Sequence, residues 1–183
     1  MLKFCVILIV TCCSLAFVSR AQDTTNAPKT EIENFEAQTG TVIIKGFGQI
    51  GSVTASAGVI SVRCKESATT TSHKEYGIAI EFASNQQREL LIVDYDEIDS
   101  LINGIDYLGK ITYNVTSLPG FEATYTTKSG LRIVAYASKR QGGIQSFLQF
   151  CDSPRILLTP DQMVQLESLI GQAKTSLDSL RTK

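Results

Sequence analysis

The chain has 183 residues, of which 43% are hydrophobic and 19% are charged. This balance is typical of globular proteins, and it excludes a collagen-like, coiled-coil or disordered polymer. A chain of this length forms one domain, or two small halves that share a core, which excludes a large multidomain enzyme.

The first 21 residues have the pattern of a secretory signal peptide. Lys3 precedes an uncharged apolar run over residues 4–18, and the Ser-Arg-Ala sequence at 19–21 has small residues where a signal peptidase requires them. The run is shorter than the roughly 20 residues of a membrane-spanning helix. We therefore predict cleavage, an exported protein of the periplasm, cell envelope or extracellular space, and no membrane span in the mature chain. An uncleaved signal, or lipid attachment at Cys12 or Cys13, is the alternative.

Cleavage after Ala21 changes the charge and the cysteine count. It removes two basic residues and no acidic one, which leaves 15 basic against 18 acidic residues and a net charge of −3. Such a surface does not attract polyanions as a whole. Of the five cysteines only Cys64 and Cys151 remain. One disulfide between them is compatible with an oxidising compartment, and a small buried thiol at Cys64 is the alternative.

The first half of the remaining chain predicts four strands and a helix. Residues 22–39 form a polar lead-in. Apolar alternation and short apolar runs then predict strands at 41–45, 59–65, 76–82 and 90–93, and a helical stripe at 98–108. Asp94 is the expected N-cap of that helix, with Glu97 as its capping-box partner.

The second half repeats this order. Strands are predicted at 121–126, 131–137, 144–150 and 156–158, with a hairpin turn at Ser129-Gly130. Thr159 opens the final helix as N-cap, with Pro160 at the first helical position and Gln162 at the third. Its apolar stripe extends from Met163 to Leu180.

These two halves indicate an internal duplication. Residues 99–102 read Asp-Ser-Leu-Ile and residues 167–170 read Glu-Ser-Leu-Ile. We predict an α+β single domain over residues 40–183, built from two ββββα repeats at about 40–111 and 112–183, with antiparallel sheets and two packed helices. By arrangement alone this resembles the Whirly type of single-stranded-DNA-binding fold over about residues 40–180; no sequence motif of that family is present, and arrangement does not transfer function. An orthogonal sandwich or a partly open barrel fits the same strands.

The glycine-rich segment at 46–51 matches the G-x-G-x-x-G nucleotide-binding pattern literally. A dinucleotide site needs a helix directly after the pattern, because the helix N-terminus holds the pyrophosphate. The following residues 52–58 have no helical stripe and read as strand and turn. We therefore interpret the glycines as a bulge or bend in a curved strand.

The sequence offers no catalytic constellation. Asp94, Asp96, Glu97 and Asp99 form the densest acidic cluster, but they lack the spacing of a calcium loop and suit a helix start. His73 is the only histidine and lies in a threonine-rich polar segment. We therefore predict no catalytic residue, no metal site and no cofactor.

One basic and aromatic group is a candidate ligand-binding surface. Cations that meet phosphates and rings that stack on bases are what single-stranded nucleic acid requires. The group surrounds the second predicted hairpin and comprises Tyr125, Lys128, Arg132, Tyr136, Lys139 and Arg140. A solvated hairpin with edge cations that oppose aggregation is the alternative.

These observations predict an exported, non-catalytic binding or interaction module. Its expected partner is a protein or another ligand of the cell envelope, and export disfavours nucleic acid. The alternatives are a single-stranded nucleic-acid-binding module that uses the basic hairpin and a carboxylate-dependent glycan hydrolase. The sequence leaves the ligand and the oligomeric state open.

Overall fold

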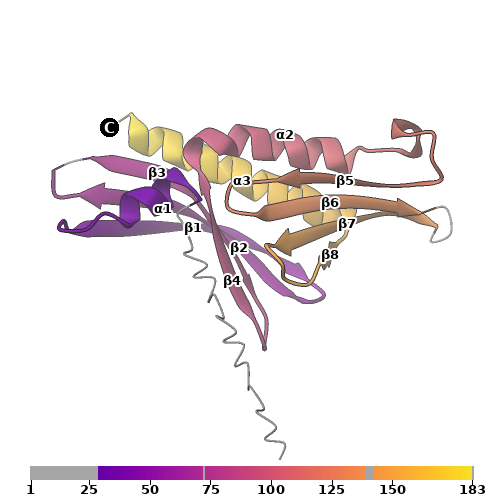
Figure 1. Cartoon of the computed structure of the whole chain (residues 1–183), viewed down its shortest axis with the longest axis horizontal. Coiled ribbons are helices and arrows are strands. Elements are labelled where there is room, and N and C mark those ends of the chain that lie inside the picture. Colours follow the sequence, from indigo (N-terminus) through magenta and orange to yellow (C-terminus); the bar gives the residue numbers. More distant parts are fainter. Residues whose placement is uncertain (1–28, 72, 139–141, 183) are drawn as a thin grey trace, which may run out of the picture.

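Two four-stranded antiparallel sheets follow each other along the chain in this computed structural model, which describes residues 29–71, 73–138 and 142–182 (Figure 1). The predicted signal peptide lies outside these residues. In both sheets the strands are hydrogen-bonded in sequence order. The first sheet contains β1 (Ile43–Ala55), β2 (Gly58–Thr69), β3 (Lys74–Ala83) and β4 (Arg88–Asp94), and the second contains β5 (Gly120–Thr126), β6 (Leu131–Ser138), β7 (Gly143–Phe150) and β8 (Ile156–Leu158).

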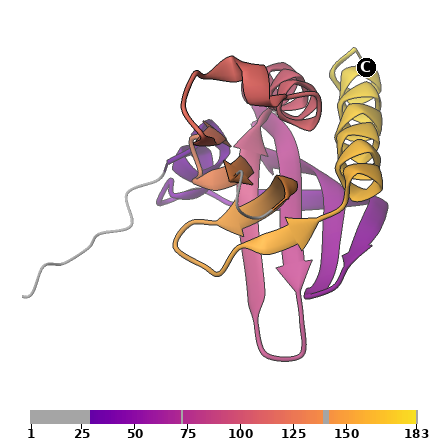
Figure 2. The same cartoon turned by 90° about the vertical axis from the view of Figure 1, so that its right-hand side faces the viewer.

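Each sheet is followed by a long helix, α2 (Ile98–Gly109) after β4 and α3 (Pro160–Arg181) after β8. The two helices lie against each other over the sheets, and Figure 2 shows α3 standing along the side of the first sheet. Short 3-10 turns occupy Tyr95–Glu97 and Tyr113–Val115. The predicted α+β class with antiparallel sheets and two packed helices is confirmed. Within the described ranges, no helix is both long and apolar enough to cross a bilayer.

One apolar core joins both sheets to both helices. Ile60 and Ile80 from the first sheet, Leu148 from the second, Ile105 from α2 and Leu166 from α3 are at most 1% exposed. Each such side chain stabilises the fold by about 1.5–3 kcal/mol relative to an exposed one. The apolar faces of the two sheets and the two helices are therefore buried against one another.

The start of α3 follows the sequence prediction. The Thr159 hydroxyl accepts the N–H of Gln162, and the Gln162 side chain accepts the N–H of Thr159. Pro160 occupies the first helical position, where its missing N–H costs no hydrogen bond. This capping box fixes where the helix begins.

The glycine-rich segment forms a bulged strand, as predicted. β1 runs without interruption through residues 46–51, and its register with β2 shifts between Gln49 and Gly51. No helix follows the segment, because β1 continues to Ala55 and turns directly into β2. The nucleotide-loop reading of these glycines is therefore excluded.

A short helix, α1 (Glu31–Glu36), lies within the segment expected to be a polar lead-in. Thr30 and Glu33 form its capping box. Ile32 is fully buried on the outer face of the first sheet, in a small apolar cluster with Ala79 and Ile92. The helix therefore occupies part of the segment interpreted as a polar lead-in, and its two buried apolar side chains, Ile32 and Phe35, attach it to the sheet.

Candidate functional site

β1 is an edge strand of the first sheet, and α3 covers only one half of that edge. The side-chain amides of Gln162 and Gln165 donate to the carbonyls of Thr54 and Ser52, at 2.7 and 3.3 Å. Among the described residues, no side chain makes such a bond to the main chain of residues 43–48. Residues 43–48 are called the open edge below. Unpaired groups on a strand edge are a template for pairing with another chain.

A groove of about 470 Å³ lies beside the open edge. Gly46 and Gly48 of β1 form its floor, next to the buried Cys64 of β2. The last turns of α3 supply Leu177 and Leu180 as an apolar wall. Its size and lining are those of a site that receives apolar side chains or a small ligand.

The two floor glycines are not required by the backbone. A Cβ atom added at Gly46 or Gly48 would meet its nearest neighbour at 3.9 or 3.7 Å, which is ordinary contact, and neither residue has a positive φ. In contrast, a Cβ at Gly51 would lie 2.6 Å from Leu169. Glycine inside a strand weakens it and often marks the close approach of a ligand or another backbone. The missing side chains at 46 and 48 keep the groove open.

Large apolar side chains are exposed on both faces of the open edge and directly before it. Val42 is 63% exposed, Ile44 57% and Phe47 51%. Leu180 at the end of α3 adds to them. Clustered exposed apolar residues of this kind mark interaction surfaces more often than isolated ones do.

Cations surround Phe47 on the outer face of the sheet. The Arg63 guanidinium lies 5.3 Å and the Lys65 ammonium 5.6 Å from the centre of its ring. Glu36 of α1 binds Lys45 and Lys65 at 2.5 and 2.7 Å. Burial opposes ionisation of Glu36, but hydrogen bonds from both lysines and from Ser67 outweigh it and lower its pKa. The outer face of the open edge therefore carries the exposed Phe47 ring, with cations beside it and Glu36 as their counter-charge.

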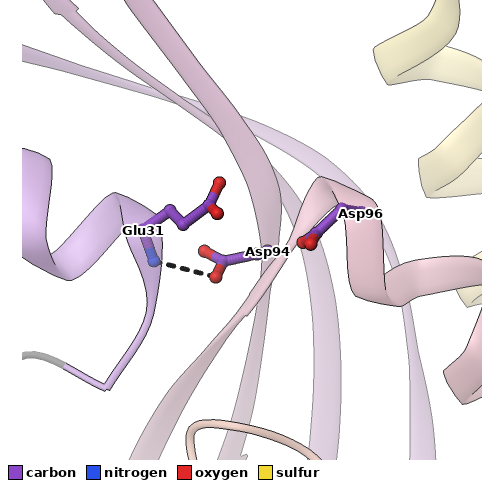
Figure 3. Close-up of side chains that lie close together, drawn as sticks. All are labelled: Glu31, Asp94 and Asp96. Atoms are coloured by element: carbon purple, nitrogen blue, oxygen red, sulfur yellow. Dashed lines mark hydrogen bonds between the residues drawn. The ribbon is translucent and has the colours of Figure 1, made fainter.

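Three carboxylates meet where α1 approaches the end of β4. Oxygens of Glu31, Asp94 and Asp96 lie within 4.8 Å of one another (Figure 3). Asp94 is 2% exposed and accepts the N–H groups of Glu31 and Ile32, at 2.8 and 3.2 Å. The Lys128 ammonium lies 3.0 Å from Asp96 and 3.6 Å from Asp94. Carboxylates can hold a hard cation, but here main-chain amides and a lysine already partner them, and we assign no metal site.

The predicted capping box at Asp94 and Glu97 was wrong. Neither side chain caps the helix that starts nearby. Asp94 binds α1 instead, and one oxygen of Glu97 accepts the N–H of Lys128 at 2.8 Å. The other oxygen of Glu97 is buried without a hydrogen-bond partner among the described residues. Burial raises the pKa of Glu97, Lys128 opposes this rise, and nearby Asp94 and Asp96 add to it.

The basic and aromatic group predicted from the sequence is spread over the second sheet. Lys128 contacts the carboxylates described above, and the Tyr125 hydroxyl lies 2.8 Å from that of Ser100 on α2. Arg132 and Tyr136 lie on β6, at positions that alternate with the buried core residues. Lys139 and Arg140 lie outside the described residues. The four described members therefore occupy three separate surroundings.

The two cysteines of the described residues, Cys64 and Cys151, are free thiols. Cys64 donates to the carbonyl of Ala173 in α3 at 3.4 Å, and Cys151 donates to the carbonyl of Ser129 at 3.6 Å. The Cys64–Cys151 disulfide that the sequence allowed is not formed in this structure. Burial raises the pKa of the Cys64 thiol, which disfavours its thiolate.

Comparison with known proteins adds no relative: no protein family, curated protein or solved structure matches the chain. The groove was missed from the sequence, because its wall comes from α3, more than a hundred residues after β1. One signal was present in the sequence. Exposed Val42 and Ile44 stand directly before Gly46 and Gly48.

Proposed function

We propose that this protein is an exported, non-catalytic interaction module that binds an extended polypeptide strand along the open edge of β1. The observation that carries the proposal is the combination of main-chain groups that pair with no other strand of the described residues and an apolar groove floored by two glycines. In strand addition, main-chain hydrogen bonds supply affinity, and pockets for alternate side chains supply specificity. The open edge and its groove offer both.

The register identifies the main-chain groups that are free to bind. In an antiparallel ladder, successive residues direct their N–H and C=O groups to opposite sides of the strand. Thr69 of β2 donates toward His73, on the side of β3. Even-numbered residues of β2 therefore bond to β1, and the register gives their partners there as Ile44, Gly46 and Gly48. Ile43, Lys45 and Phe47 are left with their groups directed outward.

The side chains that nucleic-acid binding or glycan hydrolysis would require already have partners within the fold. Lys128, central to a nucleic-acid surface, is held by Asp96 and Asp94. These two carboxylates of the densest acidic cluster bind a lysine and the start of α1, and a carboxylate-dependent hydrolase would need a pair of free carboxylates. His73 has a side chain that is 65% exposed and lies 3.3 Å from Glu75. These contacts support a binding role over catalysis.

A peptide with the sequence of residues 41–50 is the probe that tests strand addition. We expect saturable binding of the labelled peptide to protein kept at nanomolar concentration, measured by fluorescence anisotropy. Slowed hydrogen exchange of the Lys45 and Phe47 amides would show that the peptide binds at the open edge. Gly48→Val places methyl groups in the groove and should weaken binding by about tenfold or more, a cost of about 1.4 kcal/mol.

Val164→Lys is the matched surface control, because Val164 is 65% exposed on α3 outside the groove. It should bind the peptide as the native chain does. Absence of saturable binding, or binding that Gly48→Val leaves unchanged, would refute the proposal.

A further inference from the structure

We infer that the strand bound at the open edge is β1 of a second copy of this chain. This inference rests on the proposed function, because it requires β1 to accept a strand. Two open edges would pair antiparallel around a two-fold axis at Gly46 and join both first sheets into one eight-stranded sheet. We place the axis at Gly46 because of the residues that it sets opposite each other.

Only residues with outward main-chain groups can form the hydrogen-bonded pairs of the new ladder. An axis at Lys45 would place two lysines opposite each other, which is unfavourable. An axis at Gly46 places Lys45 of each copy opposite Phe47 of the other. The Phe47 ring lies 5.3 and 5.6 Å from two cations, so it can serve as a cation–π partner, and the facing Lys45 would contact it through the ring face or through its own methylene groups.

The same axis fills the groove. It places Ile44 of one copy opposite Gly48 of the other. Ile44 is an exposed apolar side chain of this edge, and Gly48 is where the missing side chain leaves space. Each copy thus supplies the side chain that the other lacks, which is the self-complementarity that a two-fold interface requires.

Charge does not oppose the pairing. Lys45 is paired with Glu36 at 2.5 Å, and the axis at Gly46 places it opposite Phe47 and not opposite the second Lys45. The contact involves few residues from each chain, which is typical of small interfaces with modest affinity. We expect a dissociation constant in about the micromolar range.

Sedimentation velocity over a concentration series tests the pairing. The purified protein should shift from monomer to dimer as its concentration rises through the micromolar range. Ile44→Lys adds a charge where Ile44 should enter the partner's groove, and we expect it to weaken association by at least tenfold. Val164→Lys adds the same charge to an equally exposed site on α3 and should leave association unchanged. Loss of association in both variants, or in neither, would overturn the inference.

A cross-link tests the axis itself. Facing Gly46 residues would form a pair without hydrogen bonds, in which Cα atoms lie about 4.5 Å apart, within the range of a disulfide. In a Cys151→Ser background, Gly46→Cys should form a covalent dimer on mild oxidation. Gly171→Cys is the control, since its Cβ has open space on α3 and should not cross-link.

The two proposals can fail separately. If the peptide of residues 41–50 binds but the chain stays monomeric at every concentration, strand addition holds and self-pairing is overturned. If a dimer forms that Ile44→Lys does not weaken and Gly46→Cys does not trap, self-pairing through β1 is also overturned. If neither peptide nor second copy binds, both proposals fall.

Discussion

Glu97 carries a pH-dependent prediction that is tested by Glu97→Gln. The residue is 9% exposed, one of its oxygens accepts the N–H of Lys128, and the other has no partner among the described residues. Burial raises its pKa most; Lys128 works against the rise, and Asp94 and Asp96 add to it. Ionised Glu97 is therefore less favourable in the folded chain than in the unfolded chain.

The direction of the effect follows from proton linkage. Because the pKa of Glu97 is higher in the folded state, the folded state binds the proton more tightly, and stability falls as pH rises through the two values. The full penalty is present at neutral pH, and it is absent below the unfolded pKa of about 4.3. Glutamine removes the charge and keeps an oxygen for the N–H of Lys128. We expect Glu97→Gln to raise the free energy of unfolding at pH 7 by about 1 kcal/mol, the lower end of the cost of a buried polar atom left without a partner.

Urea denaturation at pH 7 and at pH 3.5 measures this difference. The gain should be present at pH 7 and should vanish at pH 3.5. Glu122→Gln is the matched control, because Glu122 is exposed and pairs with Arg155 at 3.1 Å; it should lower stability at pH 7 by at most about 1 kcal/mol. Destabilisation by Glu97→Gln at pH 7, or a gain that is the same at both pH values, would refute the reasoning.

Three further predictions concern stability, each measured by chemical denaturation. Leu166→Ala removes a fully buried side chain from α3 and should cost about 2–5 kcal/mol; a loss below about 1 kcal/mol would contradict the core assignment. Gly51→Ala places a Cβ 2.6 Å from Leu169 and should cost about 1–3 kcal/mol. Gly48→Ala meets nothing closer than 3.7 Å and should be neutral or slightly stabilising. Equal changes in the free energy of unfolding for the two variants would contradict this prediction. Thr159→Ala breaks the capping box of α3 and should cost about 1 kcal/mol, and no change would show that the cap contributes nothing.

The sequence predicted elements whose signal lies within a few residues. Alternation of apolar side chains identified the strands, and Thr159 with Gln162 placed the start of α3 correctly. The glycines at 46–51 indicated a bulge, which the register shift at Gly51 confirms. Each of these features depends on local backbone geometry and on side chains close in the sequence.

Features that depend on distant partners were missed. The capping sequence from Thr30 to Glu33 was present as a signal for α1, but the helix also relies on Asp94, more than sixty residues away. For the same reason Asp94 does not cap the helix that follows it. Charge spacing alone does not tell which main-chain amides a carboxylate will bind. The groove over Gly46 depends likewise on which part of α3 passes over β1.

The two glutamines of α3 that bind the β1 edge have a consequence for the size of any assembly. Gln162 and Gln165 occupy carbonyls on the second half of the β1 edge, so a partner strand can extend along the first half only. Pairing around a two-fold axis uses that half in both chains and leaves no free template on β1 for a third. If the proposed pairing forms, growth at β1 would therefore end with two molecules, whereas a longer bare edge could pair in staggered registers with more than one partner.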